Sequence, residues 1–255
     1  MSGDVLGRSA PGPDVTVAYG GGSDQVIDLH LPRRGGPAPV VVFLHGGFWR
    51  PEYDRTHARP LAQALTHTGH LVALPEYRRI GWPGLFDDVA AGVDRTLEIV
   101  EQYGGDPERV VFMGHSAGGH LALWTAARHR LPSSSPWHRS YAAPNTTRVV
   151  ALAGCSSLEL CVGWGLGGGA AVALVGGRPE EVPDRYALAD PAALLPLDLP
   201  VTLVHGTADQ LVPVEMSRRF AALAPGANLV ELPGADHFAV IDPLSSAWPA
   251  VLAAL

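Results

Sequence analysis

The sequence lacks the features that mark a disulfide-stabilised, secreted or nucleic-acid-binding protein. It has only two cysteines, Cys155 and Cys161, which form no disulfide framework and no CxxC ligand pair. It has no basic run, and its formal charge of −7 at pH 7 disfavours nucleic acid and anionic membranes as partners. Residues 1–14 lack the apolar core of a secretory signal. We therefore expect a flexible extension there, and a cytoplasmic protein.

Signatures of metal and phosphate binding are missing as well. Histidine and aspartate are frequent, yet no H-x-x-x-H or comparable ligand spacing occurs. The stretch GWGLGGGAA lacks the Lys-Ser/Thr ending of a phosphate-binding loop. Residues 149–175 carry little charge, but glycines, a serine pair and Glu159 interrupt them, so a membrane span is disfavoured. The sequence thus predicts no metal and no cofactor.

For most of its length, the chain alternates short apolar strand patterns with helical patterns. Its 255 residues are 47% hydrophobic, which suits one α/β domain over residues 15–255. Because the later strands read as continuous apolar runs, we expect a mainly parallel eight-stranded sheet with helices on both faces. The first two strands follow each other directly, as in a hairpin. Strands are predicted at 15–19, 26–31, 40–45, 70–75, 109–114, 149–154, 201–206 and 228–233, and helices near 54–69, 85–103, 117–129, 214–224 and 244–254.

Two segments interrupt this alternation. Residues 130–148 form a polar stretch rich in proline and serine, and residues 155–195 form a longer insertion with a glycine-rich centre. Insertions after the carboxyl ends of parallel strands lie over the ligand crevice of an open α/β sheet. Residues 155–195 are therefore the candidate for a small cap.

The motif with the clearest chemistry is GHSAG, at residues 114–118. An apolar strand enters it and a helix leaves it at once, so the turn must be sharp, with the serine at positive φ. Gly114 and Gly118 give the steric room that such a turn requires. The hydroxyl is exposed at a helix N-terminus, where partial positive charge favours a developing anion. Ser116 is the predicted nucleophile.

A serine hydroxyl needs a base, and the base needs an acid to fix its tautomer. Among eleven histidines, His237 lies in the loop directly after the last strand and is the predicted base. His45, His115, His120 and His205 read instead as loop-bracing, turn-bound or buried residues. Asp209 follows a strand end and is the predicted acid, whereas Asp236 adjoins His237, and neighbouring loop side chains diverge.

This arrangement resembles the α/β-hydrolase family, and the resemblance covers nearly the whole chain. Its landmarks are HGG (45–47), GHSAG, the HGTAD loop (205–209) and the final DHF (236–238). The resemblance assigns the catalytic roles to the same serine, aspartate and histidine. The amide after the nucleophile, of Ala117, is one expected oxyanion donor. By resemblance the other donors are Gly47 and Phe48, the latter at a position where related esterases carry a further glycine.

Aromatic residues near these loops are candidates for the substrate pocket. Trp49 either walls the pocket or packs the HGG loop onto the sheet, and both readings stay open. Trp82, Trp164 and Phe238 are further pocket candidates. In esterases with an HGG loop, an acid-Tyr-Arg triplet braces the oxyanion loop, so Glu76 and Arg78 are expected to support it.

The HGG-aromatic-Trp loop is similar to that of small esterases and arylformamidases, the kynurenine formamidases. Both reactions pass through a seryl acyl-enzyme, so the triad does not separate them. We expect an enzyme that hydrolyses carboxylic esters of small acyl or aryl groups, with N-formylkynurenine hydrolysis as the alternative. An acyltransferase, a lactonase and a non-catalytic binding scaffold are weaker alternatives. The expected partner is a small-molecule ester or amide, bound by a monomer or homodimer.

Overall fold

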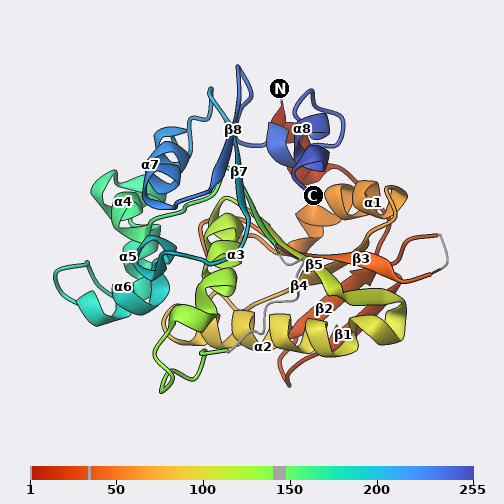
Figure 1. The fold of residues 1–255 in the computed structure, drawn as a ribbon, viewed down its shortest axis with the longest axis horizontal. Coiled ribbons are helices and arrows are strands. Elements are labelled where there is room, and N and C mark those ends of the chain that lie inside the picture. The colour runs from red at the N-terminus through yellow and green to blue at the C-terminus, as the bar shows by residue number, and fades with distance from the viewer. Residues whose placement is uncertain (1, 34–35, 140–147) are drawn as a thin grey trace.

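A computed structural model describes residues 2–33, 36–139 and 148–255 of the chain (Figure 1). Eight strands form one sheet in the order β1-β2-β4-β3-β5-β6-β7-β8, which confirms the predicted fold class. They are β1 Val15–Ala18, β2 Val26–His30, β3 Ala38–Leu44, β4 Leu71–Pro75, β5 Gly105–His115, β6 Arg148–Leu152, β7 Val201–Gly206 and β8 Asn228–Leu232.

The direction of the strands divides the sheet into two parts. β1 pairs with β2 and β2 with β4 in antiparallel fashion, while every later pairing is parallel. In the parallel part, the carboxyl ends of β3, β5, β6, β7 and β8 lie along one edge of the sheet. The loops that leave this edge carry the candidate catalytic residues.

Helices cover both faces of the sheet. Side chains of α2 (Gly84–Ile99), α3 (Ala117–Ala127) and α7 (Glu215–Leu223) join one hydrophobic core. Those of α1 (Arg59–His67) and α8 (Trp248–Ala253) join a second core on the other face. The strands between them are buried on both sides, which explains their uninterrupted apolar sequences.

The predicted cap segment is helical. It contains α4 (Leu158–Gly163), α5 (Ala170–Val175) and α6 (Pro183–Ala189), which contact one another beyond the carboxyl end of β6 (Figure 1). Glycines with positive φ separate α4 from α5, so this stretch turns tightly rather than continuing as one helix. Of the polar stretch at 130–148, residues 140–147 lie outside the described part.

The N-terminal segment, expected as a flexible extension, instead packs on the domain. Residues Ser2–Gly7 form a 3-10 helix, η1, and Val5 is buried in the second core. Arg8 donates two hydrogen bonds to the carboxylate of Asp242, at 2.5 and 3.0 Å. Apolar burial and a bidentate ion pair thus fix a segment whose polar composition gives no sign of it.

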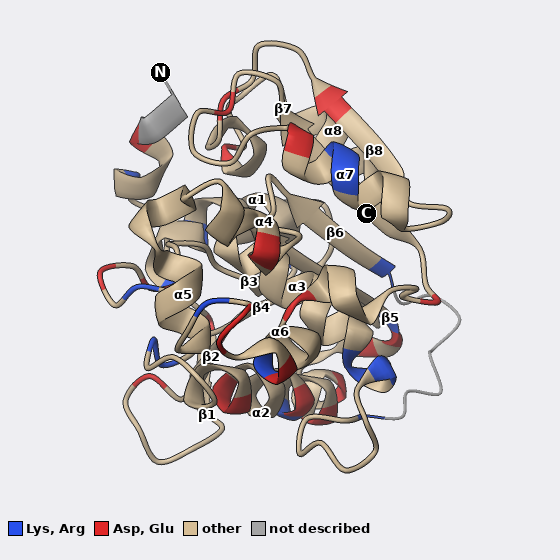
Figure 2. Cartoon of the chain, turned by 90° about the vertical axis from the view of Figure 1, so that its left-hand side faces the viewer, with Lys and Arg blue, Asp and Glu red and all other residues tan. Residues whose placement is uncertain are grey.

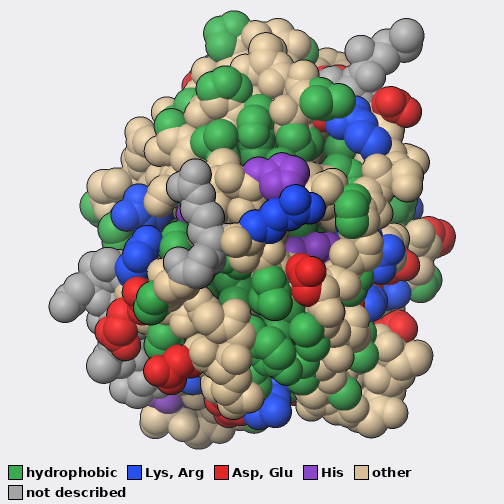
Figure 3. All heavy atoms as spheres, turned by 90° about the vertical axis from the view of Figure 1, so that its right-hand side faces the viewer, with side chains coloured by type: hydrophobic (Ala, Val, Ile, Leu, Met, Phe, Trp, Pro, Cys, Tyr) green, Lys and Arg blue, Asp and Glu red, His purple; other side chains and the backbone are tan. Residues whose placement is uncertain are grey.

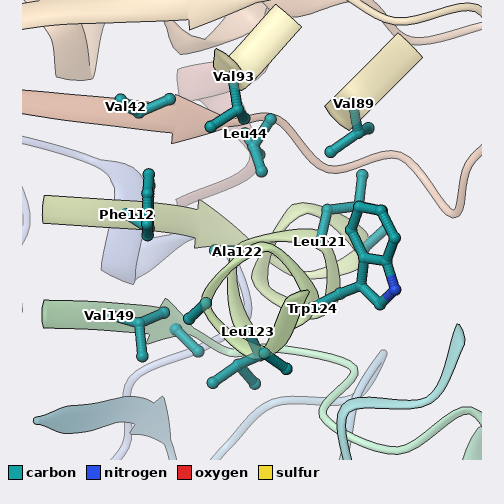
Figure 4. Close-up of a cluster of buried hydrophobic side chains, with 14 of the residues drawn as sticks. Val42, Leu44, Val89, Val93, Phe112, Leu121, Ala122, Leu123, Trp124 and Val149 are labelled. Atoms are coloured by element: carbon teal, nitrogen blue, oxygen red, sulfur yellow. The ribbon is translucent and has the colours of Figure 1, made fainter. Parts of the chain in front are cut away.

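The packing around α3 holds the centre of the molecule together. The helix reads AGGHLALWTAA and is buried along its whole length, as expected for a helix that is apolar on all sides. Figure 4 shows Leu121, Leu123 and Trp124 of α3 among side chains of β3, β5, β6 and α2. Because α3 begins at Ala117, this core also fixes the position of Ser116.

Removing a side chain from this core is expected to destabilise the fold. Leu121→Ala should lower the free energy of unfolding by about 2–5 kcal/mol, through lost apolar burial and the cavity it leaves. Urea denaturation followed by circular dichroism measures the change. Leu223→Ala is the matched control, because Leu223 is 62% exposed and should change stability by less than about 0.5 kcal/mol. Equal effects of the two substitutions would contradict this account of the core.

Candidate active site

Ser116 occupies a strained turn between β5 and α3. Its φ is 56° and its ψ is −119°, a backbone conformation that residues other than glycine rarely adopt. Close backbone approach enforces the turn: a Cβ on Gly114 would lie 2.0 Å from the carbonyl oxygen of Gly118, and one on Gly118 would lie 1.9 Å from that of Leu44. The GxSxG pattern thus has the steric origin that the sequence predicts.

The structure brings the predicted base and acid together. His237 Nδ1 lies 2.6 Å from Asp209 Oδ2, and both side chains are buried. Asp209 Oδ1 accepts hydrogen bonds from the amides of Leu211 and Val212, each at 2.8 Å. The carboxylate is therefore fixed by its own loop and directed at the ring of His237.

The environment of Asp209 keeps its carboxylate ionised. Burial raises its pKa, but hydrogen bonds from His205 and His237 and the charge of His237 outweigh burial and hold the pKa well below its usual range. His205 lies 3.3 Å from Asp209 Oδ2 and also contacts Ser217 and the carbonyl of Val212. It is thus the satisfied buried histidine expected from the sequence, and it supports the acid.

Ser116 and His237 line one cavity of about 70 Å³. His115 fixes one side of it, because its Nε2 donates a hydrogen bond to the carbonyl of His237 at 2.9 Å. Burial and the neighbouring charge of His237 hold the pKa of His115 well below its usual value, so its ring is neutral. The strand that carries the nucleophile is thereby linked to the loop that carries the base.

Amide donors suitable for an oxyanion border this cavity. Gly47 and Phe48 line it, and Ala117 follows Ser116 at the first position of α3. Among the residues that the structure describes, none accepts a hydrogen bond from the amide of Gly47, Phe48 or Ala117. The loop runs close to the nucleophile, since a Cβ on Gly46 would lie 3.2 Å from the Cβ of Ser116. Unpaired amides at such a position suit a developing oxyanion.

A buried carboxylate braces this HGG loop. Glu76 Oε1 lies 2.8 Å from His45 Nε2, and Glu76 Oε2 accepts a hydrogen bond from the amide of Arg55 at 2.8 Å. The hydroxyl of Tyr77 donates to the carbonyl of His45 at 2.7 Å. Arg78, expected beside Glu76, instead pairs with Asp88 of α2. The acid and tyrosine of the triplet hold the oxyanion loop, whereas the arginine fastens the next segment to α2.

The aromatic residues predicted to line the pocket lie in different places in the structure. Phe238 lines the cavity at Ser116. Trp82 packs against Phe86 and Trp137, in an aromatic cluster between α2 and α3. The guanidinium of Arg219 lies 5.3 Å from the ring centroid of Trp164. Trp82 and Trp164 are placed by these contacts rather than at the cavity.

Trp49 is almost fully buried against the main core, with its ring edge-on to His120. This placement matches the reading in which it packs the HGG loop onto the sheet. Its other face borders a second cavity, separate from the one at Ser116.

Four cavity residues were not singled out in the sequence. Leu6, Tyr53, His57 and Leu211 all line the cavity at Ser116. Burial and the nearby charge of His45 lower the pKa of His57 to about 4, so its ring is neutral near pH 7. These residues come from η1, from the segment after the HGG loop and from the loop after Asp209, and no motif marks them. Only the placement of these segments at the strand ends reveals them.

The described residues contain no cluster of histidine, cysteine or acidic side chains arranged to hold a metal ion. No described helix is both long and apolar enough to cross a membrane. Acidic and basic residues are interspersed along the ribbon in Figure 2, and their side chains are interspersed on the opposite face in Figure 3.

The mainly parallel sheet, the serine at the turn after β5 and the buried His–Asp pair together define an α/β-hydrolase fold with a serine-hydrolase arrangement. The chain belongs to the BD-FAE family, whose model matches residues 27–223.

Its curated relatives are esterases. A probable isoprenylcysteine alpha-carbonyl methylesterase of Oryza sativa is 30% identical over 250 residues, which cover 90% of this chain and 59% of the relative. Esterase LipQ of Mycobacterium tuberculosis is 28% identical over 242 residues, which cover 87% and 56%. The chain thus spans little more than half the length of these relatives.

Solved structures share the fold. A truncated carbohydrate esterase from gut microbiota superposes with a TM-score of 0.78 at 20% identity, covering 93% of this chain and 95% of that one. Esterase B of Lactobacillus rhamnosis gives a TM-score of 0.75 at 21% identity, covering 96% and 84%. At such identities the likeness concerns the fold alone.

The low pKa of Glu76 gives a test of the brace on the HGG loop. Burial raises this pKa, but the hydrogen bond and charge of His45, with Arg55 and Arg79, lower it from 4.5 to about 2. A depressed carboxyl pKa stabilises the folded state above the unfolded-state value, and this contribution is lost as the pH falls through the folded-state value. The stability advantage of wild type over Glu76→Gln should therefore shrink between about pH 5 and pH 2, by up to roughly 3 kcal/mol.

Denaturant unfolding at several pH values measures this difference. Glu98→Gln is the control, because Glu98 is exposed and its substitution should give a difference that stays nearly constant with pH. A constant difference for Glu76→Gln as well would show that the carboxylate is not needed in its charged form.

Proposed function

We propose that the protein hydrolyses carboxylic esters of small acyl or aryl substrates through Ser116, His237 and Asp209. The observation that carries the proposal is that a serine on a strained strand–helix turn shares one cavity with His237, whose ring lies 2.6 Å from the carboxylate of Asp209. The esterase relatives support the same reaction class. Relatives named as esterases give no support to arylformamidase activity, so the formamide serves below only as a comparison substrate.

In the acylation step, His237 takes the proton of Ser116 as the oxygen attacks the ester carbonyl carbon. The carbonyl oxygen becomes an oxyanion, which the amides of Ala117 and of Gly47 or Phe48 stabilise by hydrogen bonds. Asp209 stabilises the imidazolium that forms. The tetrahedral intermediate then collapses: the bond to the alcohol oxygen breaks, His237 returns the proton to that oxygen, and the alcohol leaves.

Water completes the reaction. His237 removes a proton from a water molecule, whose oxygen attacks the acyl-enzyme carbonyl. A second oxyanion forms at the same amides and collapses with release of the carboxylic acid, while the proton returns to Ser116. The same groups therefore serve both half-reactions, and no metal or organic cofactor is required.

The size of the cavity favours short acyl groups. Its volume of about 70 Å³ leaves room for a few water molecules at most, and the side chains of Leu6, Tyr53 and Phe238 bound it. An acetyl or propionyl group fits this space, whereas an octanoyl chain is longer than the cavity and has to extend beyond it.

The decisive measurement compares p-nitrophenyl acetate, butyrate and octanoate with N-formylkynurenine. We expect kcat/KM to fall from acetate to octanoate by at least tenfold and to be lowest for the formamide. Ser116→Ala should abolish turnover of every ester while leaving the circular dichroism spectrum unchanged. Activity retained by Ser116→Ala would overturn the assignment of the nucleophile, and formamide turnover far above the esters would overturn the substrate class.

Replacing the acid tests the role of Asp209 separately. Asp209→Asn keeps the shape of the side chain but leaves His237 in the wrong tautomer, so kcat should fall by about three to four orders of magnitude. Asp198→Asn is the matched control, since Asp198 is largely exposed at a remote turn and should leave kcat unchanged. A loss of less than about tenfold would move the acid role to another carboxylate.

A further inference from the structure

A second, larger cavity lies on the other side of Phe48 from the nucleophile. It has a volume of about 200 Å³, and Phe48 lines both it and the cavity at Ser116. Part of its wall comes from the cap segment, including Gly168 and the α5 residues Ala170 and Ala173, on the side that faces the viewer in Figure 2. Phe48 is fixed between the two cavities, because its ring packs so closely on Gly167 that a Cβ there would lie 2.5 Å from it.

The charged side chains of this cavity all have the same sign. Arg50 and Arg79 line it, and no carboxylate is among the described residues that do so. Arg50 donates to the carbonyl of Gly167 but forms no ion pair with any described residue. The chain contains no lysine, so its cationic side chains are all arginines, whose guanidinium groups suit bidentate binding of carboxylates.

Arg79 provides a buried donor without a partner. Its side chain is only 8% exposed, and its terminal nitrogens contact Glu76, Asp24 and the carbonyl of Tyr77. Its Nε atom is buried and has no hydrogen-bond partner, and the same holds for Nε1 of Trp49, which also lines the cavity. Both atoms have almost no solvent-accessible area, so they lie beneath the surface of the cavity.

We propose that this cavity is a subsite for a carboxylate carried by the ester substrate, an inference that rests on the proposed function. A single carboxylate matches Arg50, which is exposed and is, among the described residues that line this cavity, the one cation without an ion pair. The apolar side chains of Ala170, Ala173 and Leu174 accept the carbon chain or ring that joins the carboxylate to the ester. Phe48 then separates the reacting ester group from this anionic end.

Two matched substrate pairs test the subsite and show which part of the ester enters it. The alcohol side is tested by p-acetoxybenzoate against p-acetoxybenzamide. The acyl side is tested by p-nitrophenyl hydrogen adipate against p-nitrophenyl hexanoate. Within each pair the scissile bond is alike and only the charge at the far end differs. The quantity measured is the ratio of kcat/KM for the anionic ester to that for the neutral one, at pH 7.

In one of the two pairs, this ratio should fall roughly tenfold in Arg50→Gln, which removes a charge-assisted hydrogen bond. Ala173→Leu should lower it similarly by filling the cavity from an exposed helix position. Arg95→Gln is the matched control: it removes the same charge from an exposed site on α2 and should leave the ratio unchanged. An effect in the first pair places the alcohol in the subsite, and an effect in the second places the acyl chain there.

Calorimetric titration with p-hydroxybenzoate and with adipate tests the subsite without turnover. Binding of either anion that is lost in Arg50→Gln and Ala173→Leu but kept in Arg95→Gln supports the proposal. If the neutral esters are hydrolysed but ratios and binding are the same in all variants, the subsite is overturned and the proposed function stands. If no ester is hydrolysed, the proposed function fails, and the titration alone decides for or against the subsite.

Discussion

The rest of the site depends on one close approach between backbones, at the turn that carries Ser116. Gly118 lies against the end of β3 so tightly that a methyl group there would overlap the carbonyl of Leu44. This contact places the start of α3, with its unpaired amide at Ala117, directly beside the HGG loop. Backbone sterics thus bring the proposed nucleophile and the proposed oxyanion donors together.

Two buried carboxylates hold the groups on either side of this turn. Asp209 fixes the ring of His237, and Glu76 fixes the HGG loop through His45. In both cases hydrogen bonds and positive charge overcome the cost of burial, so each acid stays ionised within the protein. His115 joins the two sides, since it ends the strand that carries the nucleophile and binds the carbonyl of His237. Buried hydrogen bonds therefore hold the His237 ring, its carbonyl and the HGG loop in place.

The sequence predicts the strands and the turn that position the site far better than it predicts the residues that line the cavity. The inner strands are evident in the sequence because buried parallel strands leave continuous apolar runs, and Gly114 and Gly118 mark the turn because only glycine fits there. Trp82 and Trp164, predicted as pocket residues, have their ring contacts away from the residues that line the cavity at Ser116. The packing of an aromatic residue in a loop depends on which distant segments lie next to it. The local sequence pattern does not contain that information. Leu6 and His57 were missed because segments remote in sequence bring them to the cavity.

Phe48 belongs both to the HGG loop that positions the site and to the lining of the cavity. Phe48 and Trp49 both have positive φ, which costs free energy for bulky residues and persists only where the surroundings enforce it. This chain accepts that strain, and the ring of Phe48, packed on Gly167, borders both the cavity at Ser116 and the larger cavity. In the proposed mechanism the backbone of Phe48 serves the oxyanion, and in the proposed subsite its side chain separates the two ends of the substrate. Under these two proposals catalysis and selectivity are coupled in a single residue, so a substitution at position 48 that changes substrate preference also alters the oxyanion loop.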